Sequence, residues 1–566
     1  MRNIFTNGNY ITKPKECKEQ IRKFFKKVYE ISGNSHFFEF FDNLWYNPVR
    51  KERKGLKPVI AKVGTCALWG LDGFEVTTEV HFASGDPELN MIGLPDLAVK
   101  ESINRIRAAA ESMNLRLPGG RITVNLAPAD RKKQGSGFDL PILIALLCKT
   151  ALQNVSLEGT FFFGEVGLGG NLRGVTGALP LALAARRAGA KRLFVPLENA
   201  PECSVVEGLT VYGAETVRQV SDHLLGQNLL SPTVFSMEKA AAAQSCPVDF
   251  RDIRGQSVAK RALEIAAAGG HNLLLVGPPG SGKSMLSKAL PGILPEMDFE
   301  EMLCTTAIHS VGGTLPQGVS LLTRRPFRSP HHTMSFAGLA GGGQNPQPGE
   351  LSLAHGGVLF LDELPEFEKR SLEVLRQPLE DRCITITRAA WKLTFPAEFM
   401  LVCAMNPCPC GYFGDESHKC TCTKKSVERY LGKISGPLLD RIDMRVEVPA
   451  LSYEELQSTA PAESSETVRE RVNRAREIAK KRYEAHGVRC NGALSGALTK
   501  RYCIPDEGAA ALLQESFSAL NLSARGYDRI LRLARTIADL EESEAILEHH
   551  VLEAVQYRVS SEKYFG

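Results

Sequence analysis

A phosphate-binding loop is the first feature of the sequence that could perform chemistry. Gly277, Gly282, Lys283 and Ser284 occur at the spacing G-x-x-x-x-G-K-S, directly after the apolar run at 273–276. Glycines let consecutive backbone N–H groups turn toward phosphate oxygens, the lysine reaches the β- and γ-phosphates, and the hydroxyl binds Mg²⁺. The segment therefore predicts a site for ATP and Mg²⁺ that is formed by Gly277, Pro278, Pro279, Gly280, Ser281, Gly282, Lys283 and Ser284.

An acidic pair follows a second apolar run. Positions 358–361 read VLFL, and Asp362 and Glu363 come directly after them. Open α/β sheets bind their ligands at the carboxyl ends of the strands, so we expect this pair at the same edge as the phosphate loop. Asp362 is expected to hold Mg²⁺, and Glu363 to orient or deprotonate the attacking water.

Three polar residues further along complete the set that ATP hydrolysis needs. Asn406 ends another apolar strand and suits a hydrogen bond to the attacking water or the γ-phosphate. Arg441 could neutralise transition-state charge at a neighbouring subunit's nucleotide. Arg525 lies near the start of an amphipathic helix and could contact the γ-phosphate from a lid. Each arginine alone would suit a solvated surface; their order along the chain is what predicts a role in hydrolysis.

Several segments resemble AAA+ ATPases of the magnesium-chelatase branch: FRSPHHTMS, LDELPEF, AMNPCPCG and SGPLLDRID. With the domain that precedes them, the chain is similar to the ComM/YifB family of bacterial ATPases over most of its length. The resemblance implies a multidomain α/β fold, in which an α/β Lon-protease-like domain precedes an AAA+ P-loop α/β core with a helical lid. It also implies a homo-hexamer that hydrolyses ATP and acts on branched or single-stranded DNA, as a branch migration helicase in natural transformation.

Composition and resemblance together predict the domain boundaries. The N-terminal extension at 1–58 is basic and aromatic, and we interpret it as irregular. Alternatively, it is an arm that contacts nucleic acid or a partner protein. The expected regions are an extension at 1–58, a Lon-protease-like domain at 59–228, a linker at 229–248, an AAA+ core with magnesium-chelatase-type insertions at 249–450, and a helical lid at 451–566.

The region at 59–228 alternates β- and α-forming segments, which is typical of a compact α/β domain. It resembles the Lon-protease-like domain, whose proteolytic members use a serine and a lysine as a dyad. Aligned with that family, the serine position falls on Gly137, one past Ser136, and the lysine position falls on Leu181. The helix has no lysine before Lys191. We therefore expect a module without proteolytic activity that serves binding or assembly.

Two insertions in the AAA+ region are candidates for DNA contact. The first lies between the phosphate loop and the acidic pair. The second, CITITRAAWKLTFP, alternates apolar and polar residues and predicts a β-hairpin. Basic loops repeated around a pore would follow a phosphate backbone without choosing a base sequence. Alternatively, the hairpin packs on a neighbouring subunit. The basic residues are Arg324, Arg325, Arg328, His331 and His332 in the first insertion, and Arg388 and Lys392 near the hairpin tip.

Four of the 14 cysteines form a cluster in the sequence. Cys408, Cys410, Cys420 and Cys422 make two C-x-C pairs, and His418 is a spare ligand. Four thiolates can hold zinc tetrahedrally, although C-x-C is less typical of zinc ribbons than C-x-x-C. Free thiols or redox-active cysteines are the alternative to a structural Zn²⁺.

Length and charge exclude some classes of function. A chain of 566 residues is long enough for several domains, and a net charge of +4 does not suggest a polybasic nucleic-acid binder, so DNA contact must come from local patches. No apolar run approaches the roughly 20 residues of a membrane span. The first residues lack the apolar core of a secretory signal, and we expect a cytoplasmic protein.

Two other functions compete with a DNA motor. The chain could be the motor subunit of a magnesium-chelatase-type metal insertion complex, but the Lon-protease-like domain in front of the ATPase argues against this. An ATP-dependent protease is disfavoured because the Ser/Lys dyad is missing.

Overall fold

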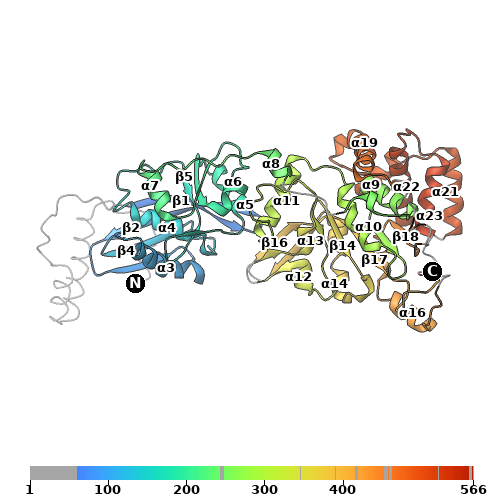
Figure 1. Cartoon of the computed structure of the whole chain (residues 1–566), viewed down its shortest axis with the longest axis horizontal. Coiled ribbons are helices and arrows are strands. Elements are labelled where there is room, and N and C mark those ends of the chain that lie inside the picture. Colours follow the sequence, from blue (N-terminus) through green and yellow to red (C-terminus); the bar gives the residue numbers. More distant parts are fainter. Residues whose placement is uncertain are drawn as a thin grey trace, which may run out of the picture. The chain divides into compact units, whose positions relative to one another are not determined.

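The computed structural model describes residues 60–566 except 243–247, 344–345, 389–390, 415–417, 452–454, 456, 458–461, 521, 560–563 and 565–566. The predicted N-terminal extension at 1–58 lies outside the described residues. The described part contains two main β-sheets, each with helices packed on it (Figure 1). Among the helices of these ranges, none combines the length and the apolarity that crossing a bilayer requires.

The first module is built on a seven-stranded mixed sheet in the order β3-β4-β2-β1-β5-β8-β9. β1 pairs along its full length with β2 as an antiparallel hairpin, and β5, β8 and β9 continue the sheet in parallel from β1. The strands are β1 Ile60–Trp69, β2 Asp72–Ala83, β3 Glu88–Ile92, β4 Arg121–Ala127, β5 Thr160–Phe162, β8 Arg192–Pro196 and β9 Thr210–Ala214, with a small separate pair of β6 Glu165–Val166 and β7 Leu172–Arg173.

The helices of this module are α3 Leu97–Ser112, α4 Asp139–Leu147, α5 Ala178–Arg187, α6 Ala200–Cys203 and α7 Val217–Leu224. Every residue of α4 is buried, and its one charged side chain, Asp139, is paired with Arg105 at 2.8 Å. Ser136 donates its hydroxyl hydrogen bond to a carboxylate, that of Glu165, rather than to an amine. Leu181 packs in the apolar core beneath α5. Leu181, at the aligned lysine position, therefore supplies no amine to a Ser/Lys dyad.

The second module has a five-stranded parallel sheet in the order β11-β14-β17-β10-β18. Successive residues of its central strands enter the cores on opposite faces: Leu273 and Leu275 on one side, Leu274 and Val276 on the other. Burial of both faces explains why these strands are continuously apolar. The strands are β10 Leu273–Val276, β11 Phe327–Arg328, β14 Val358–Leu361, β17 Met400–Met405 and β18 Met444–Glu447.

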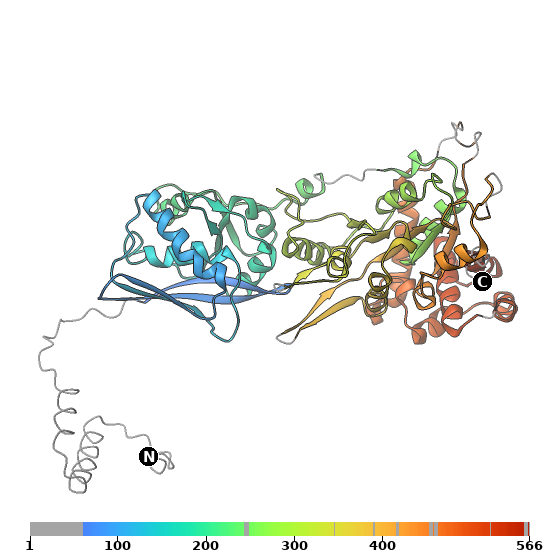
Figure 2. The same cartoon turned by 90° about the horizontal axis from the view of Figure 1, so that it is seen from below.

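Helices and two hairpins surround this parallel sheet. The predicted β-hairpin is present as β15 and β16, whose six residue pairs extend away from the sheet (Figure 2). Its tip at 389–390 is outside the described residues. The elements are α9 Ser257–Gly269, α10 Lys283–Ala289, α11 Phe299–Val311, α12 Phe336–Ala340, β12 Gly341–Gly342, β13 Gln347–Pro348, α13 Glu350–Leu353, α14 Lys369–Glu373, α15 Arg376–Asp381, β15 Cys383–Arg388, β16 Trp391–Pro396, α16 Lys424–Leu431 and α17 Gly436–Leu439.

Buried hydrogen bonds join the two modules. The hydroxyl of Ser310, in α11, donates to the Glu202 carboxylate, and the backbone N–H of Gly177 donates to the Ser310 carbonyl at 2.9 Å. Burial raises the pKa of Glu202. The linker between the modules contributes α8, Met237–Ala242.

The C-terminal region is helical and lies together in Figure 1, in orange to red. Two of its helices, α19 and α22, pack on α9, which lies against the parallel sheet. The helices are α19 Ser465–Tyr483, α20 Gly496–Tyr502, α21 Glu507–Ala519, α22 Ala524–Leu540 and α23 Glu548–Val559.

A nearly buried carboxylate, that of Asp443, ties these helices to the sheet. It accepts a hydrogen bond from the backbone N–H of Asn272 at 2.9 Å and pairs with Arg529 of α22 at 3.1 Å. Burial alone would raise the pKa of Asp443, but Arg529 and His271 outweigh it and hold that pKa well below its usual range. Its charge therefore stabilises the folded state.

We expect Asp443→Asn to lower the free energy of unfolding by about 3 kcal/mol at pH 7, because Arg529 would be left buried without its counter-charge. A carboxylate with a lowered folded pKa stabilises the fold above its unfolded pKa of about 3.9 and loses this effect in more acidic solution. The difference between wild type and variant should thus be constant above about pH 5 and shrink below about pH 4. Denaturant unfolding across this pH range measures it. Asp440→Asn, at an exposed neighbouring position, is the control, and an unchanged stability of Asp443→Asn at pH 7 would contradict the assignment.

Candidate nucleotide-hydrolysis site

The phosphate loop connects the end of β10 to the start of α10, at the carboxyl edge of the parallel sheet. Gly280 and Gly282 have φ angles of 78° and 91°, a region that residues with a Cβ rarely adopt. At Gly277, a Cβ would lie 2.1 Å from the carbonyl oxygen of Val448, so a side chain has no room. These glycines therefore set the path of the loop.

The ammonium group of Lys283 lies inside this loop. Its Nζ donates to the carbonyl oxygens of Gly277 at 2.8 Å and Pro278 at 2.7 Å. It also lies 3.4 Å from the side-chain oxygen of Asn406, which brings the predicted lysine and the predicted polar strand end together. Burial lowers the pKa of Lys283 to about 8, against an opposing effect from Asp362.

The two predicted Mg²⁺ ligands are in direct contact. The Ser284 hydroxyl donates to Oδ2 of Asp362 at 2.7 Å, although the residues are 78 positions apart. The other oxygen, Oδ1, accepts from the backbone N–H of Glu363 at 2.9 Å. Hydroxyl and carboxylate oxygens beside a phosphate loop fit the ligand preference of Mg²⁺.

The predicted base, Glu363, has a strained backbone and a partner that the sequence did not indicate. Its φ of 51° is left-handed, which is uncommon for a residue other than glycine and occurs often at functional sites. Its Oε2 lies 3.2 Å from Nδ1 of His332. In the sequence, His332 belongs to the basic residues of the first insertion, for which DNA contact is the expectation. β11 and β14 are neighbouring parallel strands, and His332 and Glu363 follow their carboxyl ends. A sequence-based prediction that these two strands pair would have placed the two side chains near each other.

A cavity of about 980 Å³ lies beside the phosphate loop and is suited to a nucleotide base and sugar. The side-chain amide of Gln256 closes one edge by donating to the carbonyls of Ser281 at 3.3 Å and Pro449 at 2.8 Å. Val258 and Tyr557 supply apolar surface. The start of α9, which precedes the phosphate loop in the chain, therefore lines this cavity.

The two predicted arginines lie outside this group of contacts. Arg441 is almost buried; its guanidinium pairs with Glu380 and donates to the Pro437 carbonyl at 2.6 Å. To reach the nucleotide of a neighbouring subunit, Arg441 would have to leave Glu380, and its role in stabilising transition-state charge there stays a prediction. Arg525 is exposed in the first turn of α22, and within the described ranges no hydrogen bond or ion pair joins it to the phosphate loop.

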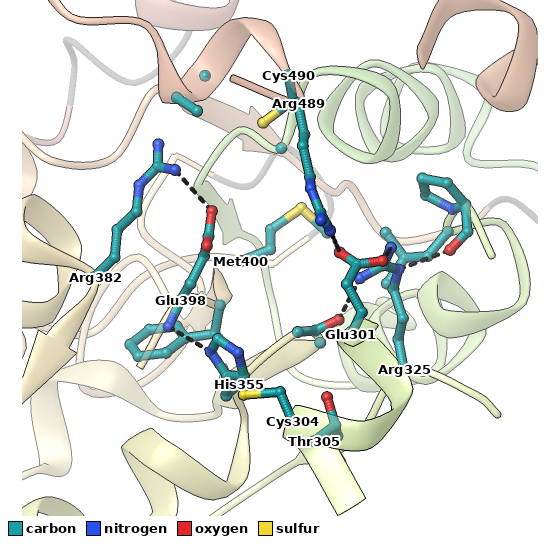
Figure 3. Close-up of a pocket in the computed structure, with 18 of the residues that line it drawn as sticks. Glu301, Cys304, Thr305, Arg325, His355, Arg382, Glu398, Met400, Arg489 and Cys490 are labelled. Carbon is teal, nitrogen blue, oxygen red and sulfur yellow. Dashed lines mark hydrogen bonds and ion pairs between the residues drawn. The ribbon is translucent and has the colours of Figure 1, made fainter. Parts of the chain in front are cut away.

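A second cavity, of about 480 Å³, lies at the opposite edge of the sheet, where Met400 begins β17 (Figure 3). Glu301 pairs there with Arg325 at 3.1 Å and with Arg489 at 2.8 Å, and Arg382 pairs with Glu398 at 2.8 Å. These labelled charges satisfy one another. The cavity therefore lies where the parallel-sheet module meets the C-terminal region, at the edge of the sheet opposite the phosphate loop.

The predicted DNA-contact residues fall into two groups. In the first group, Arg325 pairs with Glu301 at the second cavity, and Arg328 forms two hydrogen bonds to the Glu350 carboxylate at 2.6 and 2.7 Å. Both would have to break these pairs to reach a phosphate. Arg324, Arg388 and Lys392 are exposed.

Part of the hairpin that carries Arg388 and Lys392 packs against another segment of the chain. Leu393 of β16 is buried, and a Cβ on Gly70 would lie 3.1 Å from it. Gly70 lies in the turn between β1 and β2 of the first module. The middle of the hairpin therefore packs against the turn between β1 and β2. By the strand register, Lys392 lies on the opposite face, whereas Arg388, nearer the tip, shares the face of Leu393.

The four clustered cysteines are also close together in space. The sulfurs of Cys408, Cys410, Cys420 and Cys422 all lie within 4.8 Å of one another. They follow Asn406 directly, at the end of β17.

Fold and site together define a magnesium-chelatase-like AAA+ module with a P-loop α/β core. Comparison with known families agrees: residues 249–456 match the family described as magnesium chelatase, subunit ChlI, residues 78–199 match subunit ChlI of Mg-chelatase, and residues 462–558 match the ChlI C-terminal region.

Individual relatives narrow this class. The chain is 43% identical to competence protein ComM of Haemophilus influenzae over 88% of its own length and 97% of the relative. It is 42% identical to YifB of Salmonella typhimurium, with the same shares covered. A magnesium-chelatase 67 kDa subunit of Chlorobaculum parvum is 31% identical over 28% of this chain and 23% of that protein. The chain belongs to the ComM/YifB family of magnesium-chelatase-like proteins.

Lys283 and Glu363 should fail differently when they are replaced. Lys283→Ala removes the cation inside the loop, so we expect loss of ATP binding. Glu363→Gln keeps the size of the side chain and removes the base, so ATP should still bind while hydrolysis falls by about 10²-fold or more. Equilibrium binding of a fluorescent ATP analogue and phosphate release measure the two effects. Normal turnover by Glu363→Gln would show that this residue is not the base.

His332 should affect turnover more than binding. If His332 holds Glu363 in place, His332→Ala should lower kcat by about tenfold and leave KM for ATP nearly unchanged. This loss is smaller than the whole rate contribution of a positioned general base. His332→Asn, which can still donate a hydrogen bond, should recover part of the rate. His331→Ala is the matched control at the adjacent position. Equal losses in the His331 and His332 variants would contradict a specific role.

Proposed function

We propose that this protein is an ATP-driven ring motor that acts on DNA, with branch migration or helicase activity in the recombination of incoming DNA during natural transformation. The observation that carries the proposal is the joined Ser284–Asp362 pair beside the phosphate loop, in a chain similar over most of its length to a protein named for competence. The expected assembly is a homo-hexamer.

The residues divide the hydrolysis of ATP among them. Ser284 and Asp362 would hold Mg²⁺, which supplies charge neutralisation at the phosphates when bound. Lys283 binds the β- and γ-phosphates. Glu363 accepts the proton of the attacking water, and Asn406 orients that water or the γ-phosphate. The clustered cysteines are not expected among the Mg²⁺ ligands, because thiolates are soft ligands and Mg²⁺ prefers oxygen.

Two further groups belong to the proposed ring. Arg441 would stabilise transition-state charge at the neighbour's nucleotide after release from Glu380, and Arg525 would act from the C-terminal helices. Arg388 and Lys392 on the hairpin, with Arg324, would contact the phosphate backbone of DNA, which suits recognition without base sequence.

A metal-insertion motor is the second candidate. The observation that favours it is the match of three regions to magnesium-chelatase families. Against it, the match to a named chelatase subunit covers only 28% of the chain, whereas the matches to ComM and YifB cover 88%. ATP hydrolysis measured with and without forked DNA separates the two, since a metal-insertion motor has no reason to respond to DNA.

Reversal of the hairpin charges tests the DNA proposal. Arg388→Glu with Lys392→Glu should leave hydrolysis without DNA intact, because neither residue touches the nucleotide site. DNA affinity should fall by about tenfold or more at moderate salt, and its dependence on log salt concentration should flatten by at least about one unit of slope. Migration of a forked substrate should decline in parallel.

The matched control reverses Lys480 and Lys481, two exposed lysines of α19. This control should bind DNA as wild type does. If the hairpin variant migrates branches normally, the hairpin is not the DNA contact. If the wild-type protein shows no response to DNA, the metal-insertion candidate replaces the motor.

A further inference from the structure

The four clustered cysteines form a site that hydrolysis of ATP does not use. The sulfur of Cys408 lies 3.3 Å from that of Cys410 and 3.7 Å from that of Cys420, and Cys410 and Cys420 are 3.6 Å apart. Cys408 is fully buried, while the other members are partly exposed. His418, the spare ligand suggested by the sequence, is not in this group; its ring stacks on Tyr412 at 4.8 Å.

These separations match those of thiolates around one small metal ion. With zinc–sulfur bonds of about 2.3 Å, tetrahedral geometry places the sulfurs about 3.8 Å apart. A multi-iron cluster would need a wider cage, because its inorganic core stands between the thiolates. All four cysteines are free thiols rather than disulfides. The chemistry and size of the group therefore favour a single zinc ion.

The segment that holds the cysteines is irregular, and its cysteines and Phe413 pack against the core of the parallel sheet. Between the end of β17 and the start of α16 at Lys424, the described residues form neither helix nor strand. Among its described residues, one backbone hydrogen bond, from the N–H of Gly411 to the carbonyl of Cys408, lies within the cluster itself. Metal ligation commonly supplies the folding energy of such short irregular segments.

The same segment forms part of the proposed nucleotide site. A Cβ on Gly411 would lie 2.5 Å from the ring of Pro279, so this backbone rests directly against the phosphate loop. Phe413 and Gly414 line the cavity beside that loop. Asn406, which contacts Lys283, is two residues before the first cysteine.

We propose that Cys408, Cys410, Cys420 and Cys422 bind one structural Zn²⁺, and that this ion holds the wall of the nucleotide cavity against the phosphate loop. The zinc site stands on the four sulfurs alone. Its effect on nucleotide binding rests on the proposed function, because it requires that the cavity bind ATP.

The first measurement is metal content of the full-length protein, by elemental analysis after purification without chelator. We expect about one zinc per chain, released stepwise with modification of four thiols by a mercurial reagent. Cys420→Ser with Cys422→Ser should abolish the zinc. Cys148→Ser with Cys304→Ser, at two free cysteines elsewhere, should retain it. Zinc-free wild-type protein that also fails to take up added Zn²⁺ would overturn the proposal.

The second measurement is affinity for a fluorescent ATP analogue, before and after zinc removal from wild-type protein. Affinity should fall by about tenfold and return when Zn²⁺ is added back. Since wild-type protein is used throughout, a folding defect of the cysteine variant cannot mimic the result. Zinc bound at full occupancy with unchanged affinity after its removal would overturn the coupling only. Absence of nucleotide binding in zinc-loaded protein would instead contradict the proposed function.

Discussion

The contact between Ser284 and Asp362 is the constraint on which the site depends. It joins residues 78 positions apart, and it exists only because β10 and β14 are parallel strands of one sheet whose carboxyl ends open on the same edge. β17 lies between these strands and places Asn406 beside the loop. Burial of both sheet faces fixes this register, since slippage by one residue would exchange the side chains of the two cores. The core thus positions the chemistry.

Much of this arrangement could be predicted from sequence because the motifs carry their own local structure. The spacing around Lys283 specifies a strand, a turn of left-handed glycines and a helix, and the alternation at 383–396 specifies a hairpin whatever the rest of the fold does. Asp362 was predictable because continuous apolarity identifies a buried parallel strand. In each case the side chains and the elements that position them lie close together in the sequence.

The features that could not be predicted depend on pairing between distant segments. The sequence presents Arg324, Arg325 and Arg328 as one basic group, yet Arg325 and Arg328 have acidic partners, Glu301 and Glu350, from separate helices. Charge patterns along a chain do not show which ions are already neutralised. The contact of His332 with Glu363 is hidden in the sequence for the same reason, because Glu363 follows the neighbouring strand.

The contact between His332 and Glu363 bears on the proposed motor function. His332 belongs to the irregular segment between β11 and α12, which leads on to the β12–β13 hairpin, while Glu363 is held in a left-handed conformation that costs energy. A residue in such a conformation persists only while its surroundings hold it. Among the described residues, an ion-pair contact joins His332 to Glu363, so on the proposed function this insertion would act on the base rather than on the phosphate loop. Binding of ATP and its hydrolysis would then respond to different parts of the chain, as a motor that couples hydrolysis to its substrate requires.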